Sequence, residues 1–285
     1  MNKAWEEYRQ TLTQELGDEL AHEFADSLYR QSRGNPARAT RFFYELGMQW
    51  APLMQHWGSW IEQNANGTVA LIMRDAKPLG VLPRAKHWKH LYLNRLVCGI
   101  SDELSGDSTA QKHPLLERYL KQQGCAEEFT FVDSGCYGTI VLELHRIGVK
   151  FKPLFFFSKN PSIPGFLNEL GVSLKDGELL NDSLECGFPH LHARPLTLAK
   201  RFGKVQAVLQ NSDALSVRFG KAAMRGVQEA RDARTVSPEQ AAESLLRLSE
   251  RARCGAFTGI LGHTSPEWTK KSEFLESWPK ELSWT

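Results

Sequence analysis

Short apolar runs alternate with helical segments along the middle of this sequence, and this alternation constrains the fold more than any other feature. The run Thr68-Val-Ala-Leu-Ile-Met73 is typical of a strand that is buried on both faces of a sheet. Strands that alternate with helices indicate an α/β fold, in which a parallel sheet is joined by right-handed crossover helices. The predicted strands are residues 68–73, 90–95, 129–133 and 151–157, and the predicted helices between them are residues 78–89, 114–123 and 139–146.

Helical segments flank this alternation on both sides. Apolar residues near helical spacing predict a helix over residues 2–31, and Pro36 is well placed to open a second, aromatic-rich helix that ends near Asn64. Further helices are predicted over residues 163–170, 212–232 and 237–252. The predicted domains are a helical hairpin over residues 1–66, an α/β phosphate-binding core over residues 67–200 and a mostly helical region over residues 201–285.

The composition is that of an ordinary folded protein. Of 285 residues, 41% are hydrophobic, and 35 Lys and Arg stand against 33 Asp and Glu, so the formal net charge is only +2. This balance excludes a wholly disordered chain and argues weakly against nucleic acid as a partner. No apolar run approaches the roughly 18 residues that span a bilayer. Because the charged N-terminus also lacks the apolar core of a signal peptide, we expect a cytoplasmic protein without membrane contacts.

The segment from Phe131 to Thr139 has the features of an anion-binding loop. Asp133 ends a predicted buried strand and would face the crevice where parallel sheets bind ligands, as a partner for a ribose hydroxyl or Mg²⁺. Glycines let the backbone approach a phosphate, and the free N–H groups at the start of the next helix favour negative charge. The simpler interpretation is a tight strand-to-helix turn. The loop residues are Ser134, Gly135, Cys136, Tyr137, Gly138 and Thr139.

A second polar loop follows the first predicted strand. Arg74 and Lys77 would clamp a phosphate or pyrophosphate, and Asp75 would hold a metal or act as a base. Arg95, at the end of the next predicted strand, would join the same positively charged pocket. The alternative is a surface loop of salt bridges. The Walker A and dinucleotide-binding glycine patterns are absent from the chain.

Other chemistry is less well supported by the residues. Cys136 precedes a helix whose dipole would lower the pKa of the thiol, but His145 is too far along that helix to activate it. The five cysteines include no Cys-x-x-Cys pair, which favours reduced thiols over a disulfide framework or a zinc site. Asp182 and Glu185 would reach the same crevice from a predicted loop, whereas His190 and His192 are candidates for a metal pair without a further ligand or for the partner of the Cys136 thiol.

The first predicted strand, the loop with Arg74 and Lys77, and the later strand with its Asp133 loop and helix follow one another as in the type I phosphoribosyltransferases, which the chain resembles over roughly residues 45–160. More narrowly, these segments resemble the divergent phosphoribosyltransferase-like proteins of bacterial stress and defence gene clusters. The resemblance implies that Asp133 faces the ribose, that residues 134–139 cradle the 5-phosphate and that residues 74–77 form the pyrophosphate loop. It further implies phosphoribosyl pyrophosphate or a nucleotide as ligand, Mg²⁺ as cofactor, and Asp133 and Asp75 as catalytic residues.

The same blocks also resemble the region that follows the hydrolase domain in large haloacid-dehalogenase-like proteins of surface-polysaccharide clusters. In those proteins an Arg-Asp-Gly segment, a strand ending in Arg and an Asp-x-Gly-x-x-Gly-Thr segment occur in this order. The counterparts here are Arg74-Asp75-Ala76, Asn94-Arg95 and the segment from Asp133 to Thr139. The Asp-x-Asp motif of the hydrolase domain itself is absent, which argues against phosphatase activity.

These features leave three functions open. The first is a phosphoribosyltransferase-like enzyme that displaces pyrophosphate from a phosphoribosyl ligand with the help of Mg²⁺. The second is a non-catalytic nucleotide sensor or interaction module on the same fold, in which the aromatic helical regions would contact a protein partner or a second copy of the chain. The third is a hydrolase that cleaves a phosphoester or N-glycosidic bond with Asp75 or Asp133.

Overall fold

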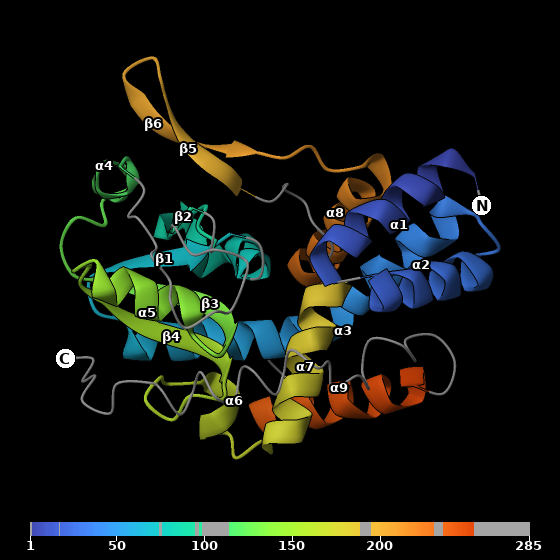
Figure 1. Cartoon of the computed structure of the whole chain (residues 1–285). Helices are drawn as coiled ribbons and strands as arrows, with labels where there is room; N and C mark the ends of the chain where they lie inside the picture. The colour runs from blue at the N-terminus through green and yellow to red at the C-terminus, as the bar shows by residue number, and fades with distance from the viewer. Residues whose placement is uncertain are drawn as a thin grey trace.

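The structure is a computed structural model that describes residues 2–16, 18–73, 76–94, 97–98, 114–188, 195–230 and 236–253 (Figure 1). The strands are β1 (Thr68–Ile72), β2 (Lys89–Leu91), β3 (Phe129–Cys136), β4 (Phe151–Ser158), β5 (Pro195–Arg201) and β6 (Lys204–Leu209). The α-helices are α1 (Lys3–Leu16), α2 (Asp18–Ser32), α3 (Pro36–Asn64), α4 (Leu116–Gln122), α5 (Thr139–Arg146), α6 (Phe166–Glu169), α7 (Leu174–Gly187), α8 (Ala214–Glu229) and α9 (Pro238–Arg253). Two short 3₁₀ helices are η1 (Lys77–Val81) and η2 (Pro83–His87).

The centre of the fold is a four-stranded parallel sheet in the order β2-β1-β3-β4. In its register, Leu71 of β1 stands opposite His90 of β2 on one side and Val132 of β3 on the other, and Val132 stands opposite Leu154 of β4. The prediction of an α/β fold with a parallel sheet is therefore confirmed.

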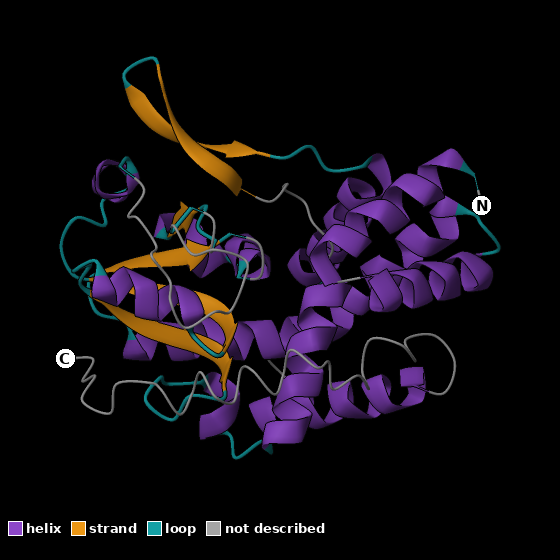
Figure 2. Ribbon diagram, in the orientation of Figure 1, coloured by secondary structure: helices purple, strands orange, loops and turns teal. Residues whose placement is uncertain are grey.

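Helices cover both faces of this sheet (Figure 2). Because successive side chains on a strand point to opposite faces, Leu71, Val132 and Leu154 share one face and join the core cluster that contains α3. Ile72 and Phe131 point to the other face and join the cluster that contains α4 and α5. The strands β1, β3 and β4 are thus buried on both sides, which explains their largely apolar sequences, whereas Lys89 and His90 of β2 are exposed.

The N- and C-terminal helices meet where α3 crosses α8. At Gly47 of α3 an added Cβ would lie 2.0 Å from the carbonyl oxygen of Ala223, so the two backbones are in direct contact. Next to this crossing Phe43 stacks on Phe219 with ring centroids 4.9 Å apart, and Trp5 of α1 packs on the same Phe219 ring. Aromatic side chains from three helices therefore form one core.

The predicted boundaries of α3 are confirmed. The helix begins at Pro36, whose missing N–H costs nothing at that position, and the side chain of Asn35 accepts a hydrogen bond from the N–H of Ala37 at 2.9 Å. It ends at Asn64. The single helix predicted over residues 2–31 is wrong, since the described structure has two helices there, α1 and α2, which end at Leu16 and begin at Asp18.

Three other predictions are corrected by the structure. The helix predicted over residues 78–89 is instead η1 and η2, because Pro83 cannot donate a backbone hydrogen bond within a continuous α-helix. The strand predicted over residues 90–95 is the shorter β2. The loop expected around Asp182 and Glu185 belongs to α7, whose N-cap Ser173 accepts a hydrogen bond from the N–H of Asp176.

A β-hairpin follows α7 and was not predicted. Strands β5 and β6 pair antiparallel, and Phe202 and Gly203 form the turn between them, both at positive φ. The hairpin is fastened to α4, because Arg118 donates a hydrogen bond to the Gly203 carbonyl at 2.8 Å and Gln122 bonds the backbone of Val205. No helix in the described part of the chain has the length and apolar character needed to cross a membrane.

Candidate functional site

The strand order sends the segments after β1 and β3 to opposite faces of the sheet. After β1 the chain passes to η1, which packs on the face that α3 covers, and after β3 it passes to α5 on the opposite face. Where neighbouring parallel strands send their connections to opposite faces, the loops separate and leave room for a ligand beyond the carboxyl ends of the strands. We call this region, formed by the segments after β1, β3 and β4, the sheet-edge site.

Two glycines shape the end of β3 and the turn from β3 to α5. Gly135 has a φ of 109° and pairs with Phe157 of β4, and a Cβ at this position would lie 2.2 Å from the Phe157 carbonyl oxygen. Gly138 has a φ of 82° and is the N-cap residue of α5. Both positions favour glycine, and the backbone carries no side chain at these two points.

Asp133 and the start of α5 face this turn. The Asp133 side chain is half-buried, and its Oδ1 accepts a hydrogen bond from the N–H of Ser134 at 2.9 Å. Because Gly138 has no side chain to cap α5, the N–H groups of the first turn, from Thr139 on, have no side-chain acceptor among the described residues. Such groups carry partial positive charge that favours an anion.

Lys77 contributes a cation from the segment after β1. Its side chain is half-buried, and burial lowers the pKa of its ammonium group to about 8. The pKa of His90 on β2 is also lowered, first by burial and then by the charge of Lys77. No carboxylate pairs with Lys77 within the described ranges of the chain.

A third group, which the sequence analysis missed, follows β4. Lys159 forms an ion pair with Glu178 of α7, donates a hydrogen bond to the Tyr137 hydroxyl at 3.0 Å and lies over the Tyr137 ring at 5.1 Å from its centroid. The position of Lys159 two residues after the predicted strand over residues 151–157 was the available signal, because strand ends of a parallel sheet share one edge. This contact fixes Tyr137, a residue of the predicted phosphate loop, against α7.

The structure does not describe every predicted residue. Arg74, Asp75 and Arg95 lie outside the described residues, as do His190 and His192. The backbone of Cys136 ends β3, but its side chain is not described, and the same is true of the side chains of Asp182 and Glu185 in α7. Among the described residues of the predicted site, Lys77 begins η1, Asp133 lies within β3, and the turn that follows β3 leads into α5.

Metal-binding and thiol chemistry gain no support from the described side chains. Among them, no group of three or more His, Cys, Asp and Glu residues gathers closely enough to hold a metal ion by itself. Cys98 and Cys125 are free and buried, and burial raises their pKa values to about 12 and about 11. Thiols with such pKa values are protonated near neutral pH and are poor nucleophiles.

Comparisons with known proteins add no family assignment. No family model matches the chain, and no curated protein matches it. The resemblance to phosphoribosyltransferases therefore rests on the order and composition of the motifs.

Proposed function

We propose that the chain binds a phosphoribosyl or nucleotide ligand with Mg²⁺ at the sheet-edge site and acts as a phosphoribosyltransferase-like enzyme. The observation that carries the proposal is the strand order. It makes β1 and β3 neighbours whose following segments leave toward opposite faces of the sheet, the arrangement beside which parallel sheets bind ligands, and Lys77 and the Asp133 turn would flank the ligand there.

Each element of the site has a role in this proposal. The first turn of α5 and the glycine turn before it would hold the 5-phosphate through backbone N–H groups. Asp133 would bind a ribose hydroxyl, and Lys77 would bind the pyrophosphate together with Arg74. By fixing phosphate and pyrophosphate on either side of the ribose, these groups would position C1 for attack and screen the charge of the leaving group.

Mg²⁺ fits this arrangement as an ion that is held mainly by the ligand. Mg²⁺ in phosphate-binding sites usually keeps several waters and takes one or two protein carboxylates together with substrate phosphates. Asp133 supplies one such carboxylate, and the described residues do not form a larger cluster around it. When bound, the ion would neutralise charge on the pyrophosphate.

A thermal-unfolding experiment tests ligand binding directly. Phosphoribosyl pyrophosphate with Mg²⁺, at 100 times its dissociation constant, is expected to stabilise the fold by about 2.7 kcal/mol, and AMP, ATP and inorganic phosphate serve as comparisons. Asp133→Asn should weaken the effect because it removes the carboxylate charge. The matched control is Glu127→Gln, an equivalent change at an exposed position beside the other end of β3.

Product analysis then separates the possible activities. Pyrophosphate release on addition of phosphoribosyl pyrophosphate and a nucleobase supports the transferase. Binding without turnover contradicts the enzymatic part of the proposal and favours the nucleotide sensor, while cleavage without an acceptor favours the hydrolase. If none of the ligands stabilises the wild-type protein, or if Glu127→Gln is as damaging as Asp133→Asn, the proposed site is wrong.

A further inference from the structure

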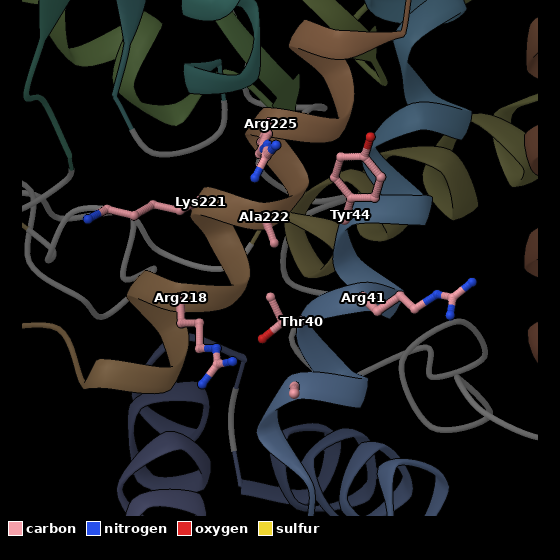
Figure 3. A pocket seen from close by; sticks show the side chains of 8 residues that line it. Thr40, Arg41, Tyr44, Arg218, Lys221, Ala222 and Arg225 are labelled. Atoms are coloured by element: carbon pink, nitrogen blue, oxygen red, sulfur yellow. The ribbon is translucent and has the colours of Figure 1, made fainter.

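A groove with four positively charged side chains lies between α3 and α8 (Figure 3). Its volume is about 540 Å³. The cations are Arg41 from α3 and Arg218, Lys221 and Arg225 from α8, and we call this surface the cationic groove. The remaining lining residues are Ala37, Thr40, Tyr44 and Ala222.

The helical spacing explains why the cations gather. Arg218, Lys221 and Arg225 are separated by three and four residues, so they share one face of α8 over about 10 Å of its length. The opposite face of α8 carries Phe219 and Ala223, which are buried against α3 and the N-terminal helices. Since α8 packs against the rest of the protein through the face with Phe219 and Ala223, its three exposed cations are not part of the hydrophobic core.

The carboxylates near the groove neutralise only part of its charge. Arg41 bonds Glu45 and Arg225 bonds Glu229, each at 2.8 Å, and both are exposed pairs one helical turn apart. Exposed pairs of this kind are weak, so both guanidinium groups can turn to another anion at little cost. Arg218 and Lys221 have no carboxylate partner in the described part of the chain.

The directions of the side chains indicate an extended anion. In Figure 3, Arg41 and Lys221 point toward opposite sides of the groove, whereas Thr40 and Ala222 point toward each other at its centre. Four charges that spread apart in this way suit several phosphates along a chain better than one phosphate group. The small side chains at the centre allow such a chain to approach the helices closely.

Tyr44 adds an aromatic surface to the groove. Its hydroxyl donates a hydrogen bond to Glu229 of α8 at 3.0 Å, which holds the ring at the border between the two helices. A positively charged groove together with an aromatic ring is the combination by which proteins bind single-stranded nucleic acids, because phosphates follow the cations and bases stack on the ring. An acidic peptide has no bases to use this ring.

We propose that the cationic groove binds single-stranded nucleic acid through its phosphate backbone, with a base stacked on Tyr44. This site is independent of the proposed function, because it shares no residue with the sheet-edge site. The near-neutral net charge of the whole chain does not oppose it, since the charges that matter are concentrated on one surface.

Fluorescence anisotropy with labelled single-stranded RNA and DNA of about 12 nucleotides tests the proposal. At about 50 mM salt, the double variant Arg218→Gln/Lys221→Gln should lose at least about tenfold in affinity, and the slope of log K against log salt should fall by about 1.4. The matched control is Arg201→Gln/Lys204→Gln, which removes the same two charges from exposed positions of the β5–β6 hairpin and should bind as the wild type does.

The ring is tested separately. Tyr44→Phe keeps the stacking surface and should retain binding. Tyr44→Leu should lower the affinity for the oligonucleotide about tenfold, as expected for removal of one base–aromatic stack. A preference between RNA and DNA identifies the natural ligand class.

The proposal is overturned if the wild-type protein binds neither strand, if the hairpin control loses as much affinity as the groove variant, or if polyglutamate competes as well as the oligonucleotide does. Asp133→Asn should leave this binding unchanged, so failure here is distinguishable from failure at the sheet-edge site.

Discussion

At the scale of single residues, the half-buried ammonium group of Lys77 lowers the stability of the folded protein at the pH values where it is charged. Burial lowers the pKa of its ammonium from the usual 10.5 to about 8. Between these two values the unfolded chain holds the proton more tightly than the folded chain does. The contribution of this group to stability therefore rises as the pH increases from about 8 to above 10, and below pH 8 the buried charge is a cost.

Replacement of this lysine should consequently stabilise the protein. We expect Lys77→Met to raise the free energy of unfolding at pH 7 by on the order of 1 kcal/mol, because solvent still reaches the half-buried ammonium and reduces the full effect of the pKa shift. Urea unfolding at pH 7 and pH 10 measures this, and the gain should shrink at the higher pH. Lys150→Met, at an exposed position before β4, should change little. A loss of stability in Lys77→Met at pH 7 would contradict this account.

At the scale of elements, the β3–α5 turn depends on the close approach of β3 to β4. A methyl group at Gly135 would collide with the Phe157 carbonyl and the Phe155 ring, and the backbone there has a positive φ. We expect Gly135→Ala to destabilise the protein by about 3 kcal/mol, from overpacking together with left-handed strain. Gly148→Ala is the control, because Gly148 also has a positive φ but no atom lies within 4 Å of the added Cβ. This variant should lower the free energy of unfolding by only about 1 kcal/mol. Denaturant unfolding compares the two, and equal losses would show that the contact with β4 is unimportant.

The elements also show where sequence reasoning succeeds and where it fails. The strands β1, β3 and β4 and the helix α5 were predictable, because buried parallel strands have continuously apolar sequences and Gly148 marks the end of the helix. The β5–β6 hairpin was not, since the turn residues Phe202-Gly203 are not one of the usual hairpin pairs. In the candidate site, the order of strand, small-residue turn and helix was predictable from a local pattern, but the loop predicted over residues 134–139 is shorter in the structure, because β3 continues past Asp133 to Cys136 and pairs with β4 there. The contact of Lys159 with Tyr137 and Glu178 was not predictable, because it joins three elements through side chains.

At the scale of the whole molecule, one aromatic core joins the helices α1, α3 and α8 to the sheet. Trp5 and Tyr8 of α1 pack on Phe219 of α8, which stacks on Phe43 of α3. The same helix α3 continues to the sheet, where Trp57 packs on Phe156 of β4 with ring centroids 4.9 Å apart. Because these contacts form one continuous cluster, the helices and the sheet should unfold together rather than as separate units.

Removal of the ring at the centre of this core tests that expectation. Phe219→Ala should cost about 3–5 kcal/mol, since Phe219 is fully buried among Trp5, Tyr8 and Phe43. Phe202→Ala makes the same chemical change at a fully exposed position in the hairpin turn and should be nearly neutral. Far-ultraviolet circular dichroism and tryptophan fluorescence, followed through urea unfolding, should report the same midpoint in the wild type and a common, lower midpoint in Phe219→Ala. If the fluorescence midpoint falls while the circular dichroism signal of the sheet and remaining helices keeps its own later transition, the aromatic core does not couple the helical regions to the sheet.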